Sequence, residues 1–174
     1  MKILWCVTGA GHFLTECVLE FEEIAKKHEV TCLLSRAGRE VVESYGLSER
    51  IRQLSQDCIK EQDQGASTPL SGSIRFHAAV IAPASANTCA KLAYGVADSA
   101  ATNIASQFIK RKIPLVILPT DYEPEITTTL PNAKKVNVHC RRIDIENTET
   151  LKKEKGVTVI TDPKKISSAL PKNS

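Results

Sequence analysis

The chain has 174 residues, of which 42% are hydrophobic and 25% are charged, and its formal net charge is +3. This length suits one core, so residues 1–174 are expected to form a single domain. No run of about 18 apolar residues is present, which argues against a membrane protein. The basic residues are scattered without interleaved aromatic residues, which argues against nucleic-acid binding. The N-terminus lacks a signal-peptide pattern and the six cysteines lack metal-ligand spacing, so we expect a cytoplasmic protein with reduced thiols and no metal.

The first half of the chain alternates between predicted strands and predicted helices. Residues 2–7 are an apolar strand, residues 8–11 a glycine turn, and apolar residues then recur at helical spacing up to residue 27. A second strand at 30–34 ends at the turn 35–38, and a helical pattern follows. Parallel strands need a crossover connection, so this alternation predicts a parallel sheet.

The middle of the chain holds a polar stretch and a third strand. Residues 53–73 are polar and show no sustained period, which predicts a long loop that serves as a lid or a subunit contact. Residues 78–82 form a strand that is stopped by Pro83, and a helix is expected from Asn87 onward.

The second half continues the pattern, beginning with a helix over 99–110 that Asp98 is expected to cap. The remaining predicted elements are strands at 114–118, 136–141 and 157–160, a short helix at 149–154, and a last helix that begins at Asp162-Pro163. Together these elements predict an α/β protein with a three-layer, Rossmann-like (flavodoxin-like) fold, in which helices cover both faces of a central parallel sheet.

Three predicted strands end in small or hydroxylated residues, at 8–11, 35–38 and 83–88. Ligands of open parallel sheets bind outside the carboxyl ends of the strands, so these loops are expected to converge on one crevice. The helix N-termini behind them suit a phosphate group, and Gly9 and Gly11 would let the backbone approach it. The alternative, that both glycines only make tight turns, is equally open, because Gly-x-Gly alone is a weak signal.

The segment 83–88 carries the strongest signal. Its alanines and Ser85 are small enough for a flat aromatic ring to lie against the backbone, and Asn87 and Thr88 supply hydrogen-bonding groups. A purely structural reading also stands, in which Ser85 or Asn87 is the N-cap of the next helix.

The sequence Pro-Ala-Ser-Ala-Asn-Thr at 83–88, followed by Lys91 and by Gly-Val-Ala-Asp at 95–98, resembles the signature of the homo-oligomeric flavin-containing cysteine decarboxylase superfamily. The resemblance implies FMN bound between the subunits of a trimer. It also implies that the phosphate lies on the first two loops and the ring on the loop 83–88.

Two pieces of the cysteine decarboxylases are missing. Residues 53–73 contain no histidine that could serve as their catalytic base, and no segment resembles their closing Pro-x-Met-Asn-x-x-Met-Trp, because the only methionine and tryptophan are Met1 and Trp5. His77 adjoins a strand and is expected at the surface. His12 follows Gly11 at the crevice and is the better candidate for contacting flavin or substrate.

A second resemblance covers nearly the whole chain. The segments at 8–11, 93–98, 102–103, 130–131 and 142–147 are similar to the archaeal branch of these proteins, the archaeoflavoproteins and the flavin-dependent dihydromethanopterin reductases. This implies an oxidoreductase or electron-transfer protein that takes electrons from a ferredoxin-type donor and passes them to FMN or on to a pterin. An iron–sulfur centre would then lie on a partner, because the chain lacks ferredoxin-type cysteine clusters.

The resemblance implies a cofactor-binding set and leaves the catalytic residues unassigned. The expected FMN-binding residues are Thr8, Gly9, Ala10, Gly11, His12, Ser35, Pro83, Ala84, Ser85, Asn87, Thr88, Ala101, Thr102 and Asn103. Two alternatives remain: an FMN-dependent decarboxylase of a cysteinyl substrate, of the phosphopantothenoylcysteine or peptidyl-cysteine type, and a non-catalytic FMN carrier.

Overall fold

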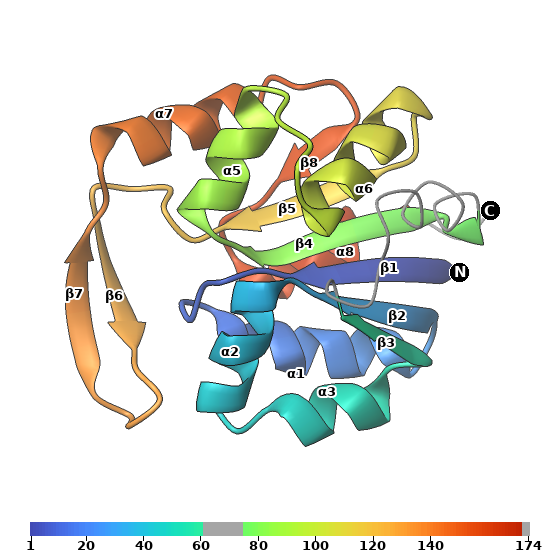
Figure 1. The fold of residues 1–174 in the computed structure, drawn as a ribbon, viewed down its shortest axis with the longest axis horizontal. Helices are drawn as coiled ribbons and strands as arrows, with labels where there is room; N and C mark the ends of the chain where they lie inside the picture. The colour runs from blue at the N-terminus through green and yellow to red at the C-terminus, as the bar shows by residue number, and fades with distance from the viewer. Residues whose placement is uncertain (61–74, 172–174) are drawn as a thin grey trace.

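The computed structural model describes residues 1–60 and 75–171. Its centre is a six-stranded sheet whose strands run in the order β3-β2-β1-β4-β5-β8, and every neighbouring pair is parallel (Figure 1). The strands are β1 (Lys2–Val7), β2 (Glu29–Leu34), β3 (Asp57–Lys60), β4 (Ala78–Ala84), β5 (Leu115–Pro119) and β8 (Val157–Val159). The predicted parallel α/β fold is confirmed.

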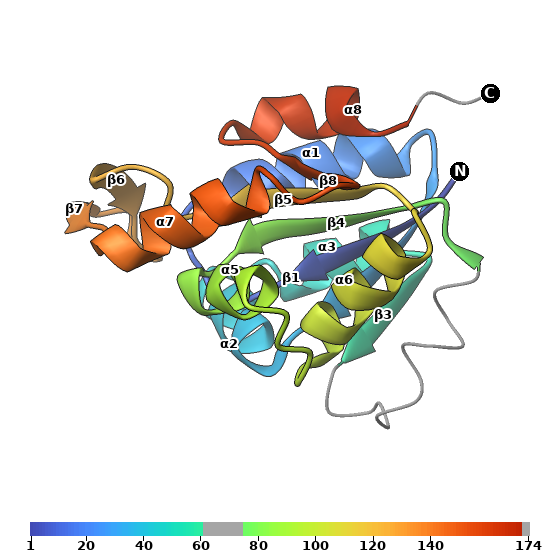
Figure 2. The same cartoon turned by 90° about the horizontal axis from the view of Figure 1, so that it is seen from above.

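Helices cover both faces of the sheet (Figures 1 and 2). The connections form α1 (Leu14–Ala25), α2 (Arg36–Ser44), α3 (Ser48–Leu54), α5 (Ala86–Ala93), α6 (Ala100–Lys110), α7 (Arg142–Leu151), the 3₁₀ turn η3 (Pro163–Lys165) and α8 (Ile166–Ala169). Alternate residues of β1 divide the core: Trp5 faces α1, α2, α3 and α8, whereas Leu4 and Cys6 face α5, α6 and α7. Within the two described ranges, no helix is long and apolar enough to cross a bilayer.

An antiparallel hairpin projects from the body of the protein (Figure 1). It consists of β6 (Glu125–Thr129) and β7 (Lys135–His139), which pair with Ile126 opposite Val138. The hairpin stands beyond the carboxyl ends of the central strands, where the first, second and third predicted loops also lie.

The structure corrects the prediction of a loop over 53–73. Residues 53 and 54 end α3, and residues 57–60 form the edge strand β3 beside β2, whereas residues 61–74 lie outside the described part of the chain. Cys58 and Ile59 of β3 are only half buried. An edge strand buries too little to give the apolar run that marked the inner strands, which explains why it was missed.

Three further features differ from the predictions: a helix cap, the bounds of a helix and an additional strand. The cap of α6 is Ser99 rather than Asp98, α7 occupies Arg142–Leu151 rather than 149–154, and β6 was not predicted. The predicted start of the last helical segment at Asp162-Pro163 is confirmed. The carboxylate of Asp162 accepts a hydrogen bond from the backbone N–H of Lys164 at the start of η3.

Gly38 lets α2 approach the end of β1. A Cβ atom at this position would lie 2.3 Å from the carbonyl oxygen of Val7, and that backbone atom cannot rotate away. We therefore expect Gly38→Ala to lower the free energy of unfolding by about 1–3 kcal/mol, the usual cost of forcing extra volume into a packed site. Urea unfolding would measure the loss.

Glu43→Ala is the matched control, because Glu43 is exposed on the same helix and its replacement should change stability by less than about 0.5 kcal/mol. Equal stability of Gly38→Ala and the wild type would show that the close approach of α2 to β1 is not a constraint.

Candidate functional site

Thr8 fastens the end of β1 to the loop after β4. Its buried hydroxyl donates to the carbonyl oxygen of Pro83 at 3.0 Å and accepts from the backbone N–H of Ser85 at 2.8 Å. The backbone N–H of Thr8 also donates to Pro83 at 3.2 Å, and the indole N–H of Trp5 donates to the carbonyl of Ala82 at 2.7 Å. Three hydrogen bonds thus hold the loop 83–88 against β1, and the fourth fixes Ala82 just before it.

Two serines cap the helices that open toward this loop. The hydroxyl of Ser35 accepts from the backbone N–H of Gly38 at 2.9 Å at the start of α2, and Ser85 accepts from the N–H of Thr88 at 3.4 Å at the start of α5. The other first-turn N–H groups of both helices have no acceptor within the helix, so each N-terminus presents donors and a positive dipole end. The structural reading of Ser85 as the N-cap is confirmed.

The first cavity, which we call the serine cleft, has a volume of about 530 Å³. It lies between the N-terminal turns of α2, α5 and α6. Its lining residues are Thr8, Gly9, Ser35, Arg36, Ala37, Glu40, Ser85, Asn87, Thr88, Lys91, Ser99 and Ala101.

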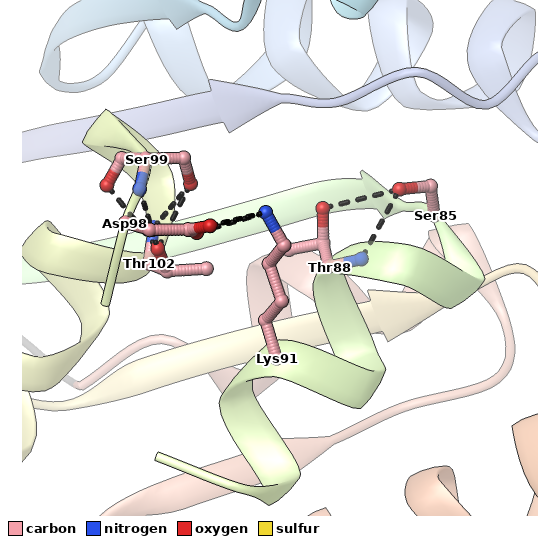
Figure 3. Close-up of polar contacts among 6 residues, drawn as sticks. All are labelled: Ser85, Thr88, Lys91, Asp98, Ser99 and Thr102. Atoms are coloured by element: carbon pink, nitrogen blue, oxygen red, sulfur yellow. Dashed lines mark hydrogen bonds and ion pairs between the residues drawn. The ribbon is translucent and has the colours of Figure 1, made fainter. Parts of the chain in front are cut away.

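One wall of the serine cleft is an ordered polar surface (Figure 3). The ammonium group of Lys91 lies 2.8 Å from both carboxylate oxygens of Asp98, and this contact lowers the pKa of Asp98. Ser99 and Thr102 form a reciprocal capping box at the start of α6. Asp98 therefore positions Lys91 at the cleft instead of capping the helix.

The second cavity, the hairpin cleft, has a volume of about 620 Å³ and adjoins the serine cleft, with which it shares Gly9, Ser85 and Asn87. The hairpin forms its outer wall. The other residues lining it are Ala10, Gly11, His12, Val41, Ser44, Tyr45, Ala86, Thr120, Asp121, Ile126, Thr128, Leu130, Pro131, Val138 and Arg141.

His12 stands out in the hairpin cleft. Its Nε2 atom is buried and has no hydrogen-bond partner among the described residues. Its ring lies against that of Phe13 with the centroids 3.8 Å apart, and Phe13 adopts the left-handed conformation with φ 64°. Burial lowers the pKa of His12, although three nearby carboxylates oppose this shift.

The two clefts bring together most of the residues that the sequence predicted. The serine cleft holds Thr8, Gly9, Ser35, Ser85, Asn87, Thr88 and Ala101, and the hairpin cleft holds Gly9, Ala10, Gly11, His12, Ser85 and Asn87. Four others lie elsewhere: Pro83 and Ala84 are buried at the end of β4, and Thr102 and Asn103 belong to α6 without lining either cleft.

Sequence reasoning missed the residues of the hairpin and two polar side chains of the hairpin cleft, Asp121 and Arg141. Asp121 directly follows Thr120 at the carboxyl end of β5, so the rule that located the other three loops could have found it. No sequence pattern marked Arg141. It follows β7 in the chain, and the course of the hairpin places it beside the cleft.

Comparisons with known proteins agree on one family. A family model described as Flavoprotein matches residues 1–172. Two proteins named dihydromethanopterin reductase (acceptor) are similar: that of Methanocaldococcus jannaschii is 39% identical over 76% of this chain, and that of Methanosarcina mazei is 36% identical over 75%. The chain spans 59% of the length of each of these relatives.

A solved structure is similar over almost the whole fold. The crystal structure of Burkholderia xenovorans DmrB in complex with FMN, described as a cubic protein cage for redox transfer, has a TM-score of 0.82 and 30% sequence identity. The match covers 97% of this chain and 92% of that chain.

The role of Thr8 can be tested by removing only its hydroxyl. Thr8→Val keeps the shape of the buried side chain but removes the acceptor of the half-buried N–H of Ser85 and the donor to Pro83, so the free energy of unfolding should fall by about 1–3 kcal/mol. Amide hydrogen exchange should also become faster at Ser85. Thr8→Ser retains the hydroxyl and should keep the exchange protection of Ser85, whereas equal exchange in all three proteins would contradict the role assigned to the hydroxyl.

Proposed function

The chain belongs to the flavoprotein family, and on that premise we propose that it binds FMN in the joined clefts and works as an FMN-dependent oxidoreductase. Its proposed substrate is a dihydropterin of the dihydromethanopterin type, and its proposed electron donor is a ferredoxin-type protein. The two reductases support this choice of substrate by name, and the FMN complex of DmrB supports the choice of cofactor.

The residues of the serine cleft fit FMN. A phosphate group suits the capped N-terminus of α2 at Ser35 and the turn that begins at Gly9, where backbone donors are available. The proposed FMN-binding set is that expected from the sequence: Thr8, Gly9, Ala10, Gly11, His12, Ser35, Pro83, Ala84, Ser85, Asn87, Thr88, Ala101, Thr102 and Asn103. Within it, the buried Thr8, Pro83, Ala84 and Thr102 would act by shaping the site, and the half-buried Asn103 would contact the cofactor of a neighbouring subunit in a trimer or a multiple of trimers.

The proposal rests mainly on the fact that the serine cleft and the hairpin cleft adjoin each other. FMN supplies hydride or single-electron transfer when bound, and the protein must hold it beside a second molecule. The serine cleft offers the cationic Lys91 and helix N-termini to an anionic cofactor, and the adjoining hairpin cleft is open for a substrate. Asn87 lies at the junction, exposed to both.

The alternative reaction is decarboxylation of a cysteinyl substrate. This chain lacks the Met- and Trp-containing segment that closes over the substrate in the cysteine decarboxylases. The only tryptophan, Trp5, is 1% exposed inside the sheet, where it cannot cover a substrate. Reduction is therefore the better supported reaction.

The test uses the purified protein and its visible spectrum. We expect a yellow protein that is bleached by a reduced low-potential ferredoxin and whose flavin absorbance returns when dihydromethanopterin is added without oxygen. A protein that binds no added FMN would overturn the cofactor assignment. Release of carbon dioxide from a cysteinyl peptide or phosphopantothenoylcysteine would favour the decarboxylase.

Asn87 provides a specific test of the cofactor site. Its side chain is exposed and lines both clefts, so Asn87→Ala should leave the protein folded while it weakens FMN binding about tenfold, as expected for one lost hydrogen bond of about 1.4 kcal/mol. Fluorescence titration of the apoprotein with FMN would measure the dissociation constant.

Asn137→Ala is the matched control, because Asn137 is exposed on β7 and lines neither cleft. Equal weakening in both variants would remove the assignment of Asn87 to the cofactor site.

A further inference from the structure

The hairpin cleft is lined by four titratable side chains: His12, Tyr45, Asp121 and Arg141. Reducing a C=N bond of a dihydropterin requires a hydride on carbon and a proton on nitrogen. The proposed cofactor accounts for the hydride alone. One of the four side chains, or solvent, must therefore supply the proton.

Three of the four are occupied by other groups. The hydroxyl of Tyr45 donates to the carbonyl of Thr129 at 2.7 Å, and burial raises its pKa. Arg141 is bound to Asp144 through two contacts of 2.7 and 2.8 Å, and a guanidinium does not give up its proton.

The third of these, Asp121, is engaged with its neighbour in the chain. The hydroxyl of Thr120 donates to its Oδ2 atom at 2.6 Å. In this contact Asp121 acts as a hydrogen-bond acceptor.

His12 is placed differently. Its Nε2 atom is buried and unpartnered among the described residues, although a buried ring nitrogen normally has a partner. Phe13, which packs against the imidazole, holds a backbone conformation that non-glycine residues rarely adopt. Such conformations persist where the surrounding structure enforces them, and they concentrate at functional sites.

A smaller cavity of about 270 Å³ adjoins the hairpin cleft, with which it shares Gly11, His12, Tyr45 and Thr128. It is lined by Glu16 at the exposed first turn of α1 and by Thr127 to Thr129 of the hairpin. His12 therefore lies where the two cavities meet and contributes to the lining of both.

We propose that His12 is the catalytic acid of the reduction, donating a proton of its imidazole ring to the pterin nitrogen as hydride reaches the adjacent carbon. The step rests on the proposed reductase function. The C=N π bond breaks, one C–H and one N–H bond form, the reduced FMN is oxidised, and neutral His12 takes up a new proton from solvent.

The charges around His12 suit this role. Glu16 on α1, together with Asp121 and Glu123 on the connection between β5 and β6, favours the protonated ring, whereas burial disfavours it more strongly and lowers the pKa. Arg141, before α7, is screened by its bond to Asp144. The imidazolium is therefore a stronger acid than free histidine, and its population rises as the pH falls.

The experiment measures single-turnover reoxidation of the FMN-loaded, reduced protein by dihydromethanopterin in a stopped-flow spectrometer without oxygen. Reoxidation of the wild type should speed up as the pH falls toward the pKa of His12, below its ordinary value of 6.5. His12→Gln should slow this step about 100-fold or more, the usual contribution of a general acid, and should remove the pH dependence.

Two controls separate proton donation from binding and folding. Oxidation of the same reduced variant by ferricyanide, which takes up no proton, should occur at the wild-type rate when both proteins are saturated with FMN, so that a change in FMN affinity does not enter the comparison. His139→Gln, which alters an exposed histidine of β7, should behave as wild type.

A second readout does not depend on activity. Burial lowers the pKa of His28 as well as that of His12, so proton NMR of the ligand-free protein should show two imidazole resonances that titrate below 6.5, of which one disappears in His12→Gln. Reoxidation of His12→Gln by the pterin at the wild-type rate would overturn the role of His12 alone. A wild type that binds FMN but is not reoxidised by the pterin would overturn the reductase function and this inference together.

Discussion

The hydroxyl of Thr8 is the connection on which the crevice depends. It joins β1 to the loop after β4 through one accepted and one donated hydrogen bond, and both partner groups belong to the backbone. Because the loop begins with small residues and turns directly into α5, few side chains of its own could fix its path. The position of Ser85, and with it the start of α5, follows from a residue 77 positions earlier in the chain.

The position of α2 after β2 depends on a close steric contact, whereas the position of α5 depends on the hydrogen bonds of Thr8. Gly38 brings the first turn of α2 against the carbonyl of Val7, and Ser35 caps that turn while its own N–H donates to the same carbonyl at 3.1 Å. The two helix N-termini are thereby fixed on either side of the end of β1. A ligand between them meets donors from two helices whose positions are set by one strand.

The sequence alone predicted the parts of the site that depend on residues close together in the chain. Strands β1, β2 and β4 end in loops whose residue types predicted a crevice, and the strand order places those three ends side by side. The choice between Ser99 and Asp98 as a cap could not be made locally, because both residue types suit an N-cap. It was decided by Lys91, whose ammonium group binds the carboxylate of Asp98 from the preceding helix.

The strand predicted at 136–141 is β7 (Lys135–His139) of the hairpin, but its partner β6 was not predicted, for a related reason. Strand β6 carries the β-branched run from Ile126 to Thr129, but its outward residues are exposed and its pairing with β7 buries little surface. Its contribution to the site arises from long-range contacts such as that between the Tyr45 hydroxyl and the carbonyl of Thr129.

That contact ties the end of α2 to the hairpin across the cleft that contains His12. Burial in this cleft lowers the pKa of His12. His12 and Thr128 of the hairpin line both the hairpin cleft and the smaller cavity beside it. The hairpin therefore adds a second, partly enclosed space next to the serine cleft, in which a buried ring nitrogen of His12 has no hydrogen-bond partner among the described residues.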